Sequence, residues 1–236
     1  MGEREYKECY IAFLDLLGFK DLIHNEKTSC EDIAKLFDEI RIEYPVTIEE
    51  EKRYLMDFDA LKQKIMSDTI CLYVDSSITN SLAGLISTCD YLQVRLLRRK
   101  TPILLRGAII KGKIYAKGDI TFGPGVSKAY LMEEKTAKYP RIILTKNLID
   151  EWKTHDFYGK DYVDTYTFRD SDAFYAVDYL YLFYGLDRGL TTWSKFARFV
   201  RNKLDTETNP SIREKYLYIE RDIPRVIHKC EEYTNA

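Results

Sequence analysis

The chain has 236 residues, of which 45% are hydrophobic and 31% are charged, and its formal net charge is −2. This is the composition of a globular protein without a strong positive field, so we expect no stable nucleic-acid partner. The five cysteines form no C-x-x-C pair, which argues against a disulfide scaffold or a zinc site. No apolar run is long enough to cross a bilayer, and the charged start MGEREYKE lacks the apolar segment of a signal peptide. We therefore expect a cytoplasmic protein with no membrane partner.

The most informative segment is residues 10–19, YIAFLDLLGF. Its apolar start predicts a buried strand, Asp15 lies at the strand end, and Gly18 allows a turn into a helix. A carboxylate at that place can hold a divalent cation. The backbone N–H groups at the start of the helix can hold the phosphates bound to the cation.

The next two elements are a broken helix and a hairpin. Residues 19–43 have helical apolar spacing, and Ser29 with Asp32 three positions on predicts a capped second segment. A charged connection, residues 44–60, follows. Residues 65–74 alternate around a Ser67-Asp68 turn, which predicts a β-hairpin with Asp68 at its tip.

The remainder of the chain mixes strands and helices. We expect a helix over 78–100, a strand over 102–110 that carries Arg106, and turns at Gly112 and Gly118 around a short strand, 113–116. The later expected elements are a helix at 126–135, a strand at 141–145, a helix at 146–153, a pair of strands at 162–168 and 173–182, and helices from residue 189 with a break at 209–210.

This order predicts an α+β fold, a ferredoxin-like or palm βαββαβ core with an antiparallel-rich sheet plus C-terminal helices. We expect the core to occupy residues 1–186 and a helical extension to occupy residues 187–236. In such a core the end of the first strand lies beside the tip of the hairpin. Asp15 and Asp68 would then form a two-metal site for nucleotide chemistry.

Four motifs, in this order, resemble those of the class III nucleotidyl cyclase catalytic domain. They are FLDLLGF, K-x-x-S-D at residues 64–68, RGAIIKG at 106–112 and FGPGVSKAYLME at 122–133. The Ser-Asp hairpin tip, RGAI, the GPGVSKAYLME block and YPRIIL at 139–144 are similar to the bacterial pyrimidine cyclases of the Pycsar anti-phage systems.

The resemblance implies a cyclase that converts UTP, or else CTP, to the 3′,5′-cyclic monophosphate and pyrophosphate as an anti-phage signal. It implies two divalent ions per site, Mn²⁺ or Mg²⁺, held by Asp15, Asp68 and the Leu16 carbonyl. It also implies a homodimer with its sites at the interface. Asp15, Asp68 and Arg106 would be catalytic, and the substrate would also be bound by Leu17, Gly18, Phe19, Lys64 and Arg141.

Two positions depart from the family pattern. The transition-state Asn and Arg of the family fall at Ser127 and Leu131, and a leucine cannot stabilise charge. Arg141 or Lys128 could substitute, and Tyr54 could narrow the base pocket. An adenylate or guanylate cyclase of the same fold and a catalytically degenerate nucleotide sensor therefore stay open. A palm-type polymerase is a weaker alternative, because the hairpin tip lacks paired acids.

Overall fold

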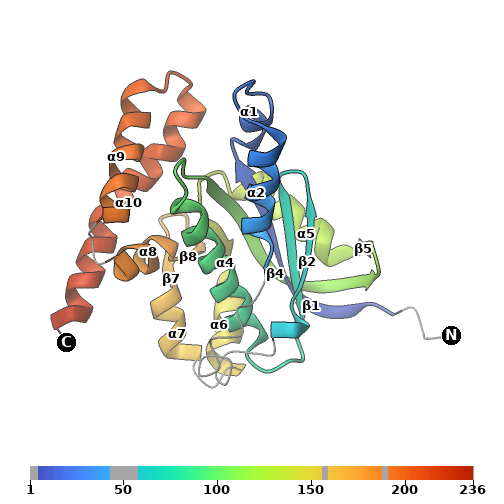
Figure 1. Ribbon diagram of the computed structural model, residues 1–236. Coiled ribbons are helices and arrows are strands. Elements are labelled where there is room, and N and C mark those ends of the chain that lie inside the picture. Colours follow the sequence, from blue (N-terminus) through green and yellow to red (C-terminus); the bar gives the residue numbers. More distant parts are fainter. Residues whose placement is uncertain (1–4, 43–57, 156–158, 188–190, 236) are drawn as a thin grey trace.

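The computed structural model describes residues 5–42, 58–155, 159–187 and 191–235 (Figure 1). Its strands are β1 (Lys7–Leu17), β2 (Lys62–Met66), β3 (Thr69–Asp75), β4 (Leu104–Lys117), β5 (Ile120–Phe122), β6 (Ile142–Leu144), β7 (Thr167–Arg169) and β8 (Tyr175–Val177). Its helices are α1 (Phe19–Ile23), α2 (Cys30–Ile40), α4 (Ser81–Leu97), α5 (Pro124–Thr136), α6 (Lys146–His155), α7 (Gly159–Tyr166), α8 (Tyr179–Asp187), α9 (Thr191–Thr206) and α10 (Pro210–Asn235), with a short 3₁₀ turn at Phe58–Ala60. None of the helices in these ranges combines the length and the hydropathy that a membrane span requires.

The strands form one sheet in the order β2-β3-β1-β4-β6-β8-β7, and β5 pairs with the far end of β4. In the described part of the chain, β4 and β6 pair in parallel and the other neighbours pair antiparallel. The protein is therefore an α+β protein with a mostly antiparallel sheet, as the sequence predicts.

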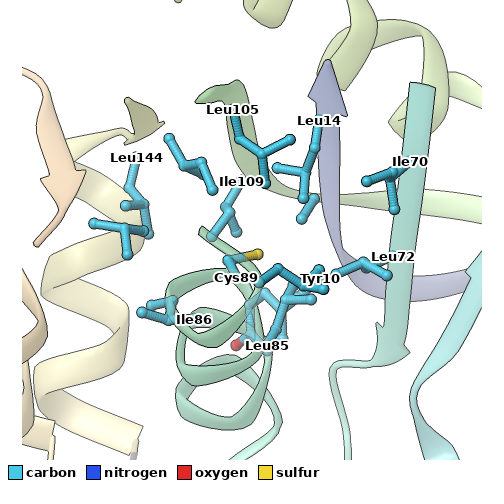
Figure 2. Close-up of a cluster of buried hydrophobic side chains, with 14 of the residues drawn as sticks. Tyr10, Leu14, Ile70, Leu72, Leu85, Ile86, Cys89, Leu105, Ile109 and Leu144 are labelled. Atoms are coloured by element: carbon cyan, nitrogen blue, oxygen red, sulfur yellow. The ribbon is translucent and has the colours of Figure 1, made fainter. Parts of the chain in front are cut away.

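β1 lies inside the sheet, and its alternating side chains contribute to two separate cores. Tyr10 and Leu14 belong to the larger core, which α2, α4, α6 and α7 also build, whereas Ile11 on the other face packs with α5. Figure 2 shows strand residues such as Leu14 and Ile109 meeting side chains of α4 in the larger core. Strict alternation places Asp15, two positions after Phe13, on the face that α5 covers.

A further apolar cluster joins the C-terminal helices to the sheet. Its buried members lie on β4 and on α4, α8, α9 and α10: Val94, Leu97, Leu104, Tyr179, Leu180, Phe183, Trp193, Phe196, Val200, Leu204, Ile219 and Val226. Members of this cluster come from both sides of residues 186 and 187, where the sequence suggests a domain boundary. Helices α9 and α10 are thus packed onto the sheet-bearing core.

Ion pairs add a polar attachment of α10. The buried carboxylate of Asp178 accepts two hydrogen bonds from Arg225, at 2.7 and 2.9 Å, and one from Lys229 at 2.8 Å. Each charge of this buried group is paired, which is the condition for burying a carboxylate without a large penalty. The contact holds α10 beside the start of α8.

Most expected elements are confirmed. The first strand, the hairpin with Asp68 at its tip and the helices at 78–100, 126–135 and 146–153 are all present, as are the two C-terminal helices. The capping box at the start of α2 forms as predicted, with Ser29 accepting from the Asp32 N–H at 3.1 Å and Asp32 accepting from the Ser29 N–H at 3.0 Å. Most of the expected connection over 44–60 lies outside the described residues.

Two expectations about the later elements are wrong. Gly112 is not a turn, because β4 continues through it to Lys117. A Cβ there would lie 2.7 Å from the Gly125 Cα, so the residue lets α5 approach the strand. The expectation of two strands at 162–168 and 173–182 is also wrong. α7 and α8 occupy much of these two ranges, and only the three-residue strands β7 and β8 form there.

Gly112→Ala is expected to lower the free energy of unfolding by about 1–3 kcal/mol, because strand and helix backbones must separate to admit the methyl group. Gly185→Ala in α8 is the matched control. It has nothing within 4 Å of the new Cβ, and we expect a change within about 1 kcal/mol, in the stabilising direction. Urea denaturation of the two variants measures both values, and equal stabilities would contradict the close approach.

Candidate active site

Backbone pairing brings Asp15 and Asp68 together at one end of the sheet. Asp15 is opposite Thr69 of β3 on one side and opposite Arg106 of β4 on the other. The Leu16 N–H donates a 2.9 Å hydrogen bond to the Asp68 carbonyl oxygen. The first strand end and the hairpin tip are therefore direct neighbours, although they are far apart in sequence.

The hairpin tip has the backbone that a two-residue turn requires. Ser67 has a left-handed conformation, with φ of 55°. Two-residue hairpin loops favour such positive φ values because they match the twist of the strands. The turn places Asp68 next to the end of β1.

Arg106 pairs directly with Asp15 of this pair. Its Nε donates to the Asp15 Oδ2 at 2.9 Å and lies 2.9 Å from Glu133 Oε1. The guanidinium is half-buried, and these two acids compensate its charge. The contact also fixes the planar fork of Arg106 at the cavity that Asp15 lines.

Glu133 is a site residue that was not expected from the sequence. Burial raises the pKa of its carboxyl to about 7, Arg106 opposes the shift, and Asp15 and Asp68 add to it. The sequence does indicate that Glu133 is buried. Glu133 follows Gly125 and Ala129 at four-residue spacing on the buried face of α5, and an acid on that face needs a partner.

The site opens into a cavity of about 610 Å³. Its walls include Asp15, Asp68 and Arg106 and the turn residues Leu16, Leu17, Gly18 and Phe19. The C-terminal region contributes five residues of α9 and α10 and one from the loop between them: Phe199, Lys203, Ile212, Lys215 and Tyr216, and Glu207. Gly18 has a φ of 80°, a conformation that glycine adopts at little cost. The expected metal ligands and the expected phosphate-binding turn thus line the same cavity.

Two expected substrate-binding residues are not part of this cavity. Lys64 donates to the Gly118 carbonyl oxygen at 2.6 Å and lines a different cavity of about 1230 Å³ between β2, β3 and the β4–β5 arm. Arg141 is 2% exposed, is ion-paired with Asp170 and Asp172 and is held near the Tyr139 and Tyr218 rings. Its side chain is already committed to these partners, and the geometry gives it no substrate role in this cavity.

The residues discussed for the missing transition-state groups also lie elsewhere. Ser127, Lys128 and Leu131 are exposed on α5, and none of them lines the cavity of Asp15 and Asp68. Tyr54 lies outside the described residues.

The donor set of the cavity fits Mg²⁺ or Mn²⁺. Asp15 and Asp68 offer hard carboxylate oxygens, and Leu16, whose backbone carbonyl is the expected third ligand, lines the same cavity. Such ions are commonly bound by one or two carboxylates together with substrate phosphates. Among the residues described, no group of three or more His, Cys, Asp and Glu side chains is arranged to hold a metal ion.

Comparisons with known proteins found structural likenesses but no sequence relatives. No protein-family model matches the chain, and no curated protein matches its sequence. A solved structure similar to it is the catalytic core of a rhodopsin-guanylyl cyclase with converted specificity, in complex with ATPalphaS. That match has 14% sequence identity and a TM-score of 0.46, and it covers 73% of this chain and 95% of the other.

The raised pKa of Glu133 predicts a pH-dependent stability. Its pKa is about 7 in the folded protein against an ordinary value of 4.5, so the folded state holds the proton more tightly. This contribution is fully present below about pH 4.5 and is lost as the pH rises through 7. Relative to Glu133→Gln, the wild type should therefore lose about 2 kcal/mol of unfolding free energy between pH 5 and pH 8.

Urea denaturation in EDTA at the two pH values measures this difference. Glu134→Gln is the control, since Glu134 is the exposed neighbour on the same helix. A pH-independent difference between wild type and Glu133→Gln would show that Glu133 titrates normally.

Proposed function

We propose that this protein is a nucleotide cyclase that converts a pyrimidine nucleoside triphosphate to its 3′,5′-cyclic monophosphate and pyrophosphate. The observation that carries the proposal is the meeting of Asp15 and Asp68 at one sheet end, with Arg106 bonded to Asp15 in the same cavity. Two carboxylates and a guanidinium that line one cavity are the groups that phosphoryl transfer needs.

The topology supports a palm-type core. The elements β1, α1–α2, β2, β3, α4 and β4 follow one another in the βαββαβ order, and their strands lie side by side as β2-β3-β1-β4. α2 and α4 share the larger core on one face of these strands (Figure 1). In this arrangement the functional ends of β1 and of the β2–β3 hairpin meet at one edge.

In the proposed reaction the ribose 3′ oxygen forms a bond to the α-phosphorus, and the bond from that phosphorus to the pyrophosphate oxygen breaks. The hydroxyl proton passes to a carboxylate of the Asp15–Asp68 pair. Arg106 and the backbone of Leu17, Gly18 and Phe19 bind the phosphates and stabilise the charge on the departing pyrophosphate. The walls of the cavity hold the sugar and the triphosphate in position.

Asp15, Asp68 and the Leu16 carbonyl would hold the divalent ions. When bound, Mn²⁺ or Mg²⁺ supplies Lewis-acid polarisation of the phosphate and favours ionisation of the attacking hydroxyl.

The substrate assignment rests on the motifs. The Ser67-Asp68 tip, the RGAI segment and the GPGVSKAYLME block support UTP, with CTP second, and an anti-phage signal as the product. Lys64 would also suit a purine base, so the same fold could serve ATP or GTP.

The proposed enzyme is a homodimer with its sites at the interface. Lys64 does not line the cavity of its own Asp15, so any contact of Lys64 with the base would be made across such an interface. Large apolar side chains are exposed on β2, the β4–β5 arm and α5, as an interface requires: Met66, Ile120, Phe122, Tyr130 and Leu131.

A nucleotide sensor is the second candidate. The observation in its favour is that Leu131 is exposed and apolar while Arg141 is occupied by Asp170 and Asp172. A sensor would bind a triphosphate with Mn²⁺ and release no pyrophosphate.

Asp15→Asn and Asp68→Asn are each expected to lower the rate of cyclic nucleotide formation at least about 100-fold, because each removes a negative oxygen donor without changing the side-chain shape. The measurement is pyrophosphate release with Mn²⁺, with the cyclic product identified by mass spectrometry.

Asp38→Asn is the control, since Asp38 is an exposed acid on α2 outside the cavity. It should keep wild-type activity. Unchanged turnover in either Asp15→Asn or Asp68→Asn would rule out the proposed mechanism.

A further inference from the structure

The C-terminal helices bring two lysines into the candidate active site. Lys203 of α9 and Lys215 of α10 line the same cavity as Asp15, Asp68 and Arg106. Figure 1 shows α9 and α10 as a helical hairpin packed at the side of the sheet. Both helices lie beyond residues 11–145, the part of the chain that carries the cyclase-like motifs.

Lys215 is the more deeply placed of the two lysines by the effect of burial on its pKa. Its side chain is half-buried, and it makes no hydrogen bond or ion pair with the residues that the structure describes. Burial lowers the pKa of its ammonium and Arg106 lowers it further, while Asp15 and Asp21 act in the opposite direction. An ammonium that is partly desolvated and unpaired costs free energy unless an anion occupies the space beside it.

Lys203 is in a similar situation. Its ammonium lies 5.8 Å from the centre of the Phe199 ring, a weak cation–π contact, and no carboxylate of the described residues pairs with it. Lys203 and Lys215 therefore present to one cavity two ammonium groups that form no close ion pair with a carboxylate of the described residues.

The backbone that carries Lys215 is firmly held. Three residues further along α10, the Tyr218 hydroxyl donates to Asp170 at 2.7 Å, and its ring stacks on Tyr139 with a centroid distance of 4.9 Å. The pairing of Arg225 and Lys229 with Asp178 fixes the next turns of the same helix. Lys215 is thus carried by a backbone that is fixed before any ligand binds, so it is a preorganised group.

The cavity needs more positive charge than its sheet side supplies. The guanidinium of Arg106 is already shared between Asp15 and Glu133. A nucleoside triphosphate carries several negative charges, and a lysine ammonium is a suitable point charge for phosphate oxygens.

We propose that Lys215, assisted by Lys203, binds the triphosphate and the pyrophosphate product from the C-terminal wall of the cavity. The α9–α10 hairpin would then be part of the substrate site, and it would supply within one chain a positive charge that the sequence lacks at Leu131. The inference deepens the proposed function and rests on it for the identity of the nucleotide.

The test is the affinity for UTP and for inorganic pyrophosphate, each with Mn²⁺, measured by isothermal titration calorimetry on the full chain. Lys215→Met, which keeps the length of the side chain, should weaken both ligands by about 10- to 100-fold. Lys215→Arg should restore most of the affinity. Lys203→Met should give a smaller loss, about 3- to 10-fold.

Lys195→Met is the matched control, since Lys195 is an exposed lysine of α9 that does not line the cavity. It should bind both ligands within twofold of wild type. Thermal unfolding checks that each variant is folded. If Lys215→Met does not fold, the affinities of Lys203→Met test the same proposal.

The outcomes separate the two proposals. If wild type forms a cyclic nucleotide and the folded lysine variants bind UTP and pyrophosphate as wild type does, the role of the C-terminal wall is refuted and the cyclase proposal stands. If wild type forms no cyclic product but Lys215→Met weakens pyrophosphate binding, the cyclase proposal fails. The proposal that Lys215 binds phosphate groups in this cavity is then supported.

Discussion

The register of β1 between β3 and β4 is the constraint on which the site depends. It places Asp15 opposite Thr69 and Arg106, and it allows the Leu16 N–H to reach the Asp68 carbonyl. Because side chains alternate along a strand, a shift by one residue would turn Asp15 into the large core and put an apolar side chain in its place. The buried apolar side chains on both faces of β1 oppose such a shift, so the core that stabilises the fold also positions the carboxylates.

The C-terminal helices complete the cavity through a separate set of interactions. An apolar cluster joins them to α4, α8 and β4, and the paired charges of Asp178, Arg225 and Lys229 fix α10. Arg141 belongs to the neighbouring network with Asp170 and Tyr218, and its ion pair with Asp170 accounts for its burial. Burial of these groups makes each network costly to break at a single position.

The sequence predicts the parts of this arrangement that have local signals. Alternation and turn residues indicate β1 and the hairpin, and the βαββαβ order indicates that Asp15 and Asp68 meet. The aromatic segment of α8 misleads, because a short apolar run buried on several sides is typical of a strand as well as a helix. The place of Lys215 has no local signal at all, since the packing of α10 on a distant part of the chain brings it to the cavity.

The most direct test of the account is to incubate the purified protein with each of the four ribonucleoside triphosphates and Mn²⁺, and to identify the products by mass spectrometry. We expect one cyclic pyrimidine monophosphate, together with pyrophosphate in equal amount. A cyclic purine product would keep the cyclase chemistry and refute the pyrimidine assignment. The absence of any cyclic product, with metal-dependent triphosphate binding intact, would contradict the central claim and favour a nucleotide sensor.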